Sequence, residues 1–257
     1  MNSNLALLNH RSKKRIQDLG EVFTPEAYVE EMLDLLAKDK KNFWSNEDIV
    51  FFEPCCGHGN IVLPLFRRRL DCIYKKAIMS GFGKSRDAAL YAVANTLNSI
   101  WAIDIDPKNI ENTRSRVFQQ ILVFLKDKLG SKTEMELITK NKNYFAHILS
   151  AIRWHIDENE TLSALSSSIE AQSHAELTKS GSKWFSSNGH NEIDFELTWV
   201  NFYESCEESN TIPMEFERSL KFLESALSGR LKGYEDYNFV KVVLSWEVES
   251  KHNELGA

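Results

Sequence analysis

The chain has little of the residues that mark specialised classes of protein. It contains only 11 glycines and 5 prolines in 257 residues, which argues against a disordered or fibrous chain. No apolar run approaches the roughly 18 residues needed to cross a bilayer. Hydrophobic residues make up 42% of the sequence, which is enough to bury a sizeable core. The length fits one large α/β domain with an appendage, or two small domains.

Cysteine is also scarce. The four cysteines are Cys55, Cys56, Cys72 and Cys206. An adjacent pair is a poor framework for disulfides, and the spacing matches no ordinary zinc motif, so we expect no metal site. We interpret Cys55 and Cys56 as small packing residues rather than nucleophiles. No signal peptide is recognisable, and we therefore expect a reducing, cytoplasmic environment.

The formal net charge of −6 disfavours a protein that coats nucleic acid by bulk charge, but it leaves a local basic patch open. Residues 1–19 hold a basic cluster, which fits either a solvated terminus or an arm that touches phosphate. Three consecutive arginines, residues 67–69, follow an apolar stretch. We interpret them as cations at the end of a helix, where the dipole favours them, rather than as a nucleic-acid patch.

Apolar runs and helical periodicity predict the order of the elements in the first half. Thr24 is a good N-cap and Pro25 suits the first position of a helix whose apolar face includes Val29 and Leu33. Downstream, we expect elements in the order strand, helix, helix, strand, helix: residues 49–52, 61–70, 86–97, 99–103 and from 108 onward. This alternation predicts a parallel sheet with right-handed crossovers.

The second half of the chain gives weaker patterns. We expect helices at 143–152 and 214–231, and strands at 153–157, 193–203 and 239–244. The segment 163–191 is rich in Ser, Ala, His and Asn and is interpreted mainly as a loop, as is 81–84.

Chemistry is indicated where two of the expected strands end. The first is followed by Glu53, a proline and the glycines Gly57 and Gly59, and the second by Asp104. Glycines let the main chain approach a ligand closely, and a carboxylate at the next strand end can accept hydrogen bonds from ribose hydroxyls. The glycine spacing is not G-x-G-x-x-G, which favours a nucleoside cofactor other than a dinucleotide.

Three segments, in this order, resemble motifs of the DNA adenine-N6 methyltransferases of restriction–modification systems. Residues 20–25, Gly-Glu-Val-Phe-Thr-Pro, are similar to the family's "Gly-x-Phe-Phe-Thr-Pro". Residues 53–60, Glu-Pro-Cys-Cys-Gly-His-Gly-Asn, resemble "Asp-Pro-Ala-Cys-Gly-Ser-Gly-Asn". Residues 102–107, Ala-Ile-Asp-Ile-Asp-Pro, resemble "Gly-Ile-Asp-Ile-Asp-Pro". The likeness covers roughly residues 20–120 and implies a Rossmann-like class I methyltransferase fold, α/β with a doubly wound, mostly parallel sheet, that binds S-adenosyl-L-methionine.

The resemblance also implies roles for single residues. It places residues of the first two motifs around the methionine and ribose of the cofactor: Phe23, Thr24, Pro25, Glu53, Cys55, Gly57 and Gly59. It implies that Asp104 binds the ribose hydroxyls and that Ile105 packs on the cofactor adenine. Asp157, after the expected third strand, stands where the family places a carboxylate for the adenine amino group.

The family's catalytic motif, Asn/Asp-Pro-Pro-Tyr/Phe, is missing, because the chain contains no Pro-Pro. The nearest imitation is at 199–204, where Asn201 would hold the target amine and Tyr203 would stack on a flipped base. We therefore expect a peripheral arm at 1–19 and a methyltransferase-like domain at 20–257, with a cofactor half (20–160) and a divergent acceptor half (161–257). DNA is the expected substrate. The alternatives are a non-catalytic relative that serves as a regulatory or DNA-binding subunit, and methylation of RNA or protein.

Overall fold

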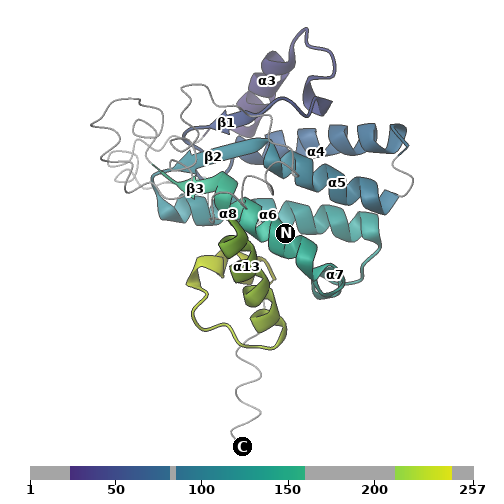
Figure 1. The fold of residues 1–257 in the computed structure, drawn as a ribbon. Coiled ribbons are helices and arrows are strands. Elements are labelled where there is room, and N and C mark those ends of the chain that lie inside the picture. The colour runs from purple at the N-terminus through teal and green to yellow at the C-terminus, as the bar shows by residue number, and fades with distance from the viewer. Residues whose placement is uncertain (1–23, 82–84, 160–211, 245–257) are drawn as a thin grey trace, which may run out of the picture.

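A computed structural model describes residues 24–81, 85–159 and 212–244 of the protein (Figure 1). In these residues, helices pack around a small parallel β-sheet, with a further group of helices from the C-terminal part against them. The expected α/β class is therefore confirmed.

Within the described ranges, the sheet consists of three short strands. They are β1 (Phe51–Glu53), β2 (Ile100–Asp104) and β3 (Ile156–Glu158). β2 lies in the centre and pairs in parallel with both of the others. Because all three strands run in the same direction, their carboxyl ends meet at one edge of the sheet (Figure 1). The parallel sheet is confirmed, although β3 begins later than expected because the helix before it continues through His155.

Helices form both connections between the strands. α4 (Val62–Met79) and α5 (Ser85–Asn98) join β1 to β2, and α6 (Pro107–Leu129), α7 (Glu134–Lys140) and α8 (Lys142–His155) join β2 to β3. α4 is longer than the expected helix 61–70, and α7 was not expected.

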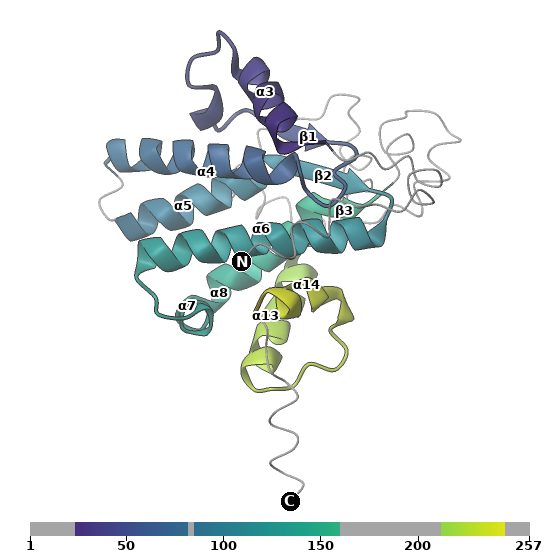
Figure 2. The same ribbon diagram turned by 180° about the vertical axis from the view of Figure 1, so that it is seen from behind.

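The start and end of α6 follow directly from local sequence. A carboxylate oxygen of Asp106 accepts a hydrogen bond from the main-chain N–H of Lys108 at 2.9 Å, and Pro107 occupies the first turn. At the other end, Gly130 has a φ of 66°, a left-handed conformation that glycine adopts at little cost. These caps position a 23-residue helix whose first turns lie beside the carboxyl ends of the strands (Figure 2).

The hydrophobic core lies between the sheet and the long helices. Ile100 and Ala102 of β2 belong to it. The helices contribute large buried side chains, among them Phe66, Ile73, Leu97, Phe118, Ile121, Leu125 and Phe145. Burial of each such side chain contributes about 1.5–3 kcal/mol, so the core is the main source of stability for the sheet edge that it supports.

The helix α3 (Glu26–Ala37) begins one residue later than predicted. Pro25 is its N-cap, no side chain caps it, and Thr24 lies outside it. Its predicted apolar face is buried only in part: Val29 and Leu33 are buried, whereas Met32 and Leu36 are 49% and 45% exposed. A short 3-10 helix, η1 (Phe43–Ser45), follows α3 and packs on α4.

The three arginines lie in the middle of α4, so their interpretation as helix-end cations is wrong. Arg67 is half-exposed and lies 3.6 Å from Glu26. Arg68 reaches α3, where it donates to Glu30 at 3.1 Å from Nε and to Asp34 at 2.5 Å from Nη1. Arg69 is fully buried under η1. Two of the three therefore attach the N-terminal elements to the core.

The buried Arg69 donates hydrogen bonds to main-chain carbonyls and to a hydroxyl group. Its Nη1 donates to the carbonyls of Trp44 (3.3 Å) and Asn46 (2.8 Å), and its Nε donates to Ser99 Oγ at 2.9 Å. The guanidinium also lies 5.2 Å from the centre of the Phe51 ring. Burial lowers the pKa of Arg69 to about 10, and the nearby Glu47 opposes this shift.

The C-terminal elements are all helical in the described residues. They are α13 (Ile212–Leu227), η3 (Glu235–Tyr237) and α14 (Asn238–Leu244). α13 packs on α8, and α14 packs on α6. The predicted strand at 239–244 is therefore wrong, and the predicted helix 214–231 ends earlier, at Leu227. Phe239 and Val240 of α14 are fully buried, which shows that burial and not strand pairing explains this apolar run.

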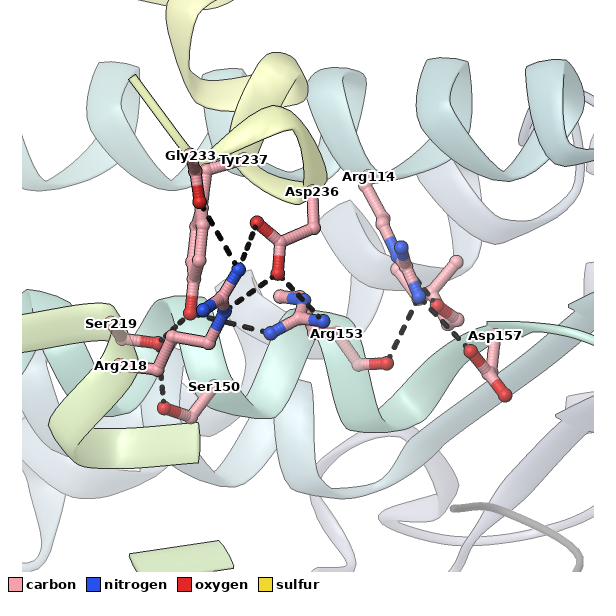
Figure 3. A network of polar contacts seen from close by, with 10 residues as sticks. Arg114, Ser150, Arg153, Asp157, Arg218, Ser219, Gly233, Asp236 and Tyr237 are labelled. Atoms are coloured by element: carbon pink, nitrogen blue, oxygen red, sulfur yellow. Dashed lines mark hydrogen bonds and ion pairs between the residues drawn. The ribbon is translucent and has the colours of Figure 1, made fainter. Parts of the chain in front are cut away.

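A chain of polar contacts ties α13 and η3 to α8 (Figure 3). Ser219 of α13 shares hydrogen bonds with Ser150 of α8 (2.9 Å) and with the Tyr237 hydroxyl (2.8 Å). Asp236 pairs with Arg153 of α8 at 3.3 Å and with Arg218 at 2.8 Å. The C-terminal helices are thus fixed to the helix that leads directly into β3.

Several predictions concern residues outside those described. These are the N-terminal arm at 1–19, residues 82–84 of the predicted loop 81–84, the predicted loop at 163–191, and the predicted strand at 193–203. Among the helices that the structure describes, none has the length and apolar character required to cross a membrane.

Candidate functional site

The turn after β1 is bound to the neighbouring strand. The main-chain N–H of Cys56 donates to the carbonyl of Ile103 in β2 at 2.9 Å, beyond the last paired residue of β1. The N–H of Gly59 then donates to the carbonyl of Cys56 at 2.9 Å, which closes a tight turn. The turn is therefore a fixed extension of the sheet edge.

Gly57 and Gly59 are needed for different reasons. Gly57 has a φ of 54°, and a Cβ there would meet no atom within 4 Å. Its requirement is the left-handed backbone, which costs other residues roughly 1–2 kcal/mol. Gly59 has a φ of 92°, and a Cβ there would lie 3.1 Å from Thr113 Oγ1. Gly59 is thus required both by its backbone and by the close approach of α6.

Asp104, at the end of β2, bonds to the turn after β1. Its Oδ2 accepts a hydrogen bond from the Gly57 N–H at 2.8 Å. Its Oδ1 accepts from the Asp106 N–H at 2.9 Å and from Asn109 Nδ2 at 3.2 Å. A carboxylate can accept about four hydrogen bonds, so a further donor can still be accommodated. The prediction that the ends of the two strands lie together is confirmed. The sequence did not indicate that Asp104 also holds the turn in place.

Glu53 lies close enough to Asp104 for their charges to repel. Burial raises the pKa of Glu53, the hydrogen bond that its Oε1 accepts from the Cys55 N–H at 3.1 Å opposes this, and repulsion by Asp104 adds to it. A second acidic group therefore lies at the same edge of the sheet, and its hydrogen bond from the Cys55 N–H holds it there.

The residue that follows Asp104, Ile105, has an exposed side chain, at 60%.

The two cysteines of the turn differ sharply in environment. Cys56 is 5% exposed, and burial raises the pKa of its thiol well above the ordinary value, so it stays protonated. This agrees with its predicted packing role. Cys55 is exposed. Its packing role is therefore not supported by burial.

Two residues of α6 hold the glycine turn, and sequence analysis did not identify them. Thr113 Oγ1 donates to the carbonyl of Gly57 at 3.0 Å, and Arg116 Nη1 donates to the carbonyl of His58 at 2.6 Å. Together with Asn109, they recur at helical spacing, which places them on one face of α6. This spacing is visible in the sequence. It points to the turn only once α6 is known to pack against it.

Asp157 is engaged inside the protein. It is 6% exposed and pairs with Arg114 of α6 at 3.2 Å (Figure 3). Arg114 also donates to the carbonyls of Ile156 (2.7 Å) and Arg153 (3.1 Å), and so clamps the junction of α8 and β3. In the sheet register Asp157 pairs with Ile103 and Glu158 pairs with Asp104. Side chains alternate between the two faces along a strand. Glu158, and not Asp157, therefore lies on the same face of the sheet as Asp104.

Only some of the remaining predicted site residues lie in the described part of the chain. Thr24 and Pro25 are described, with Pro25 exposed. Phe23, Asn201 and Tyr203 lie outside the described residues. No group of three or more His, Cys, Asp or Glu suited to a metal ion occurs in the part of the chain that the structure covers.

Comparisons of the chain with models of protein families, with curated proteins and with solved structures found no match. The residues at this edge of the sheet are therefore what the assignment of function depends on.

Proposed function

We propose that the protein binds S-adenosyl-L-methionine at the carboxyl ends of β1 and β2 and transfers its methyl group to adenine N6 in DNA. The observation that carries the proposal is the 2.8 Å hydrogen bond from the Gly57 N–H to Asp104. It supports the expected pairing of a bare glycine turn with a carboxylate at adjacent strand ends, where α/β folds bind nucleoside ligands.

The residues present fit this cofactor. The space beside Gly57 is open, since a Cβ there would meet no atom within 4 Å. Asp104 has capacity for another donor, which suits a ribose hydroxyl. The exposed Ile105 offers an apolar surface to the adenine. These three features support the cofactor roles that the motif resemblance implies.

The bound cofactor would supply a methyl group on a sulfonium, which is a strong leaving group. The protein's contribution would be to orient the acceptor amine, since positioning alone accounts for a large share of such a rate. Asn201 would hold the amine and Tyr203 would stack on the flipped base. A strand order with β2 between β1 and β3 also supports a Rossmann-like, doubly wound sheet, of which these strands would form one half.

A non-catalytic relative is the second candidate. The absence of any Pro-Pro in the sequence favours it, because the catalytic motif of the resembled family is then incomplete. Such a protein would keep the cofactor site and act as a regulatory or DNA-binding subunit.

Calorimetric titration with S-adenosyl-L-methionine tests the site that both candidates require. We expect saturable binding that weakens about fivefold in Ile105→Ala, because about 1 kcal/mol of apolar contact is lost. Val123→Ala is the matched control, since Val123 is 61% exposed on α6 and belongs to no part of the site. Absence of binding by the wild type would refute the proposal.

Transfer of a labelled methyl group to duplex DNA separates the two candidates. The enzyme hypothesis predicts label in adenine that Asn201→Ala abolishes. Binding of the cofactor without transfer to DNA, RNA or protein would favour the non-catalytic relative. Transfer that is unchanged in Asn201→Ala would remove Asn201 from the mechanism and leave the cofactor site intact.

A further inference from the structure

A pocket of about 340 Å³ lies between α6 and α14, next to the glycine turn. Four polar residues of α6 line one side of it, Asn112, Ser115, Arg116 and Gln119, and Asn112, Arg116 and Gln119 recur at the spacing of a single helix face. Val242 and Val243 of α14 form an apolar side. The volume is in the range of small-molecule sites, and an apolar wall with a few polar groups is their usual composition.

The charge of Arg116 is compensated only in part. Its Nη1 donates to the His58 carbonyl at 2.6 Å and to Asn60 Oδ1 at 3.3 Å. Among the described residues, its Nε and Nη2 have no hydrogen-bond partner and no carboxylate forms an ion pair with it. Burial lowers the pKa of Arg116, the neighbouring Arg67 adds to this, and Glu26 opposes it. A half-buried cation beside a like charge is stabilised by an anion.

We propose that this pocket binds a small organic anion, whose carboxylate or phosphate group pairs with Arg116. A guanidinium presents paired N–H donors that match the geometry of both oxyanions. The exposed amides of Asn112 and Gln119 are further donors at the rim. Val242, which is 68% exposed, and Val243 contact the apolar body of the ligand. Partial burial strengthens the ion pair relative to one on an open surface.

The pocket is separate from the cofactor edge but shares a wall with it. His58 lies between Gly57 and Gly59, and Arg116 holds the His58 carbonyl from the pocket side. An anion on Arg116 would therefore pair with a side chain that holds the turn at the His58 carbonyl, whereas Asp104 bonds the turn at the Gly57 N–H. The anion site itself does not depend on the proposed methyltransferase activity.

Calorimetry on the full chain with two probes, inorganic phosphate and benzoate, tests the site and distinguishes the two oxyanions. We expect saturable binding in the millimolar range by at least one probe. We expect tighter binding of benzoate if the valine side contributes. Val242→Asp places a carboxylate in the pocket without changing the turn, and it should weaken the binding at least tenfold. Val242→Asn, of the same shape without the charge, should weaken it much less.

Arg116→Gln should abolish the binding, whereas Arg86→Gln removes an exposed guanidinium of α5 and should leave it unchanged. Thermal unfolding of each variant checks that it is folded. In NMR spectra, the probe should shift the amide signals of His58 and Gly59. Failure of both probes to bind would overturn the proposal, as would binding that survives in Val242→Asp and Arg116→Gln. Loss of duplex-DNA binding in these two variants, without any binding of the small anions, would overturn it as well and assign Arg116 to a DNA phosphate.

Discussion

Arg114 of α6 and Asp157 of β3 form an ion pair of 3.2 Å in which the side chains are only 13% and 9% exposed. The pair fixes the last helix before β3 to the strand itself, because Arg114 also holds two carbonyls at that junction. Asp157 therefore has a structural function that the sequence did not indicate, and this function would hold whether or not a cofactor adenine lies nearby.

Removal of one partner of this pair should be strongly destabilising. We expect Arg114→Leu to lower the free energy of unfolding by about 3 kcal/mol, because the Asp157 carboxylate stays buried without its main cation. The double variant Arg114→Leu/Asp157→Leu should recover part of that loss. Lys140→Gln, which breaks an exposed pair with Glu136 at 2.6 Å, is the control and should change stability by less than about 0.5 kcal/mol. Urea unfolding measures all of them, and equal effects of Arg114→Leu and Lys140→Gln would contradict the role of the pair.

Replacement of the two turn glycines should differ in cost. Gly57→Ala should lower stability by about 1–2 kcal/mol through its backbone alone. Gly59→Ala should cost about 1–3 kcal/mol more, because the new Cβ would lie 3.1 Å from Thr113 Oγ1 and 3.2 Å from its methyl group. Thr113→Ser keeps the hydroxyl and removes that methyl group. It should therefore recover part of the loss in Gly59→Ala and none in Gly57→Ala, which thermal unfolding can test.

The three consecutive arginines of α4 should contribute unequally to stability. Arg69→Met should cost about 2 kcal/mol or more, since two partly buried carbonyls and the buried Ser99 hydroxyl lose their donor. Arg68→Met should cost about 1 kcal/mol through its two carboxylate partners, and the half-exposed Arg67→Met close to nothing. Chemical denaturation of the three variants gives the order directly. Equal costs for the three variants, or a larger cost for Arg67→Met than for Arg69→Met, would contradict the roles that these contacts assign.

Two histidines of α8 should make the fold sensitive to acid. Burial lowers the pKa of His155 to about 3 and that of His147 to about 4, with a bond to the Ile100 carbonyl opposing the shift in His155. An unfolded histidine titrates near about 6.5. Between these values the unfolded chain binds protons that the folded protein does not, so the stability present above pH 6.5 falls as the pH is lowered toward 3–4.

His147→Phe tests this dependence. Its ring stacks on Phe216 with centroids 4.0 Å apart, an arrangement that phenylalanine preserves. Urea unfolding should show a smaller loss of stability between pH 6.5 and 4 in the variant than in the wild type. The same slope in both proteins would show that His147 is not one of the groups that titrate on unfolding.

The sequence predicted the parts of the fold that depend on local pattern. Apolar runs that end in Glu53 and Asp104 gave strands within about two residues of the observed ones, as is usual for element ends. The glycines at 57 and 59 indicated the tight turn, since their positive φ values are a local requirement.

The rest depends on packing between distant segments. Arginine is seldom fully buried. The sequence therefore suggested that the arginines at 67–69 lie at an exposed helix end, and it did not indicate that Arg69 is buried. The largely apolar run at 239–244 suggested a strand, yet these residues form α14, which packs on α6. The contacts of Thr113 and Arg116 with the turn are invisible until α6 is placed beside it.

The segments that follow β1 and β3 are both bonded to the end of the central strand β2. The Cys56 N–H bonds to Ile103, the Gly57 N–H to Asp104, and the Asn159 N–H to the Asp104 carbonyl at 3.0 Å. The conformational entropy of these main-chain segments is therefore lost when the chain folds and not when a ligand binds. A molecule that docks there meets donors and acceptors that are already oriented, so its affinity is not reduced by any need to organise the main chain.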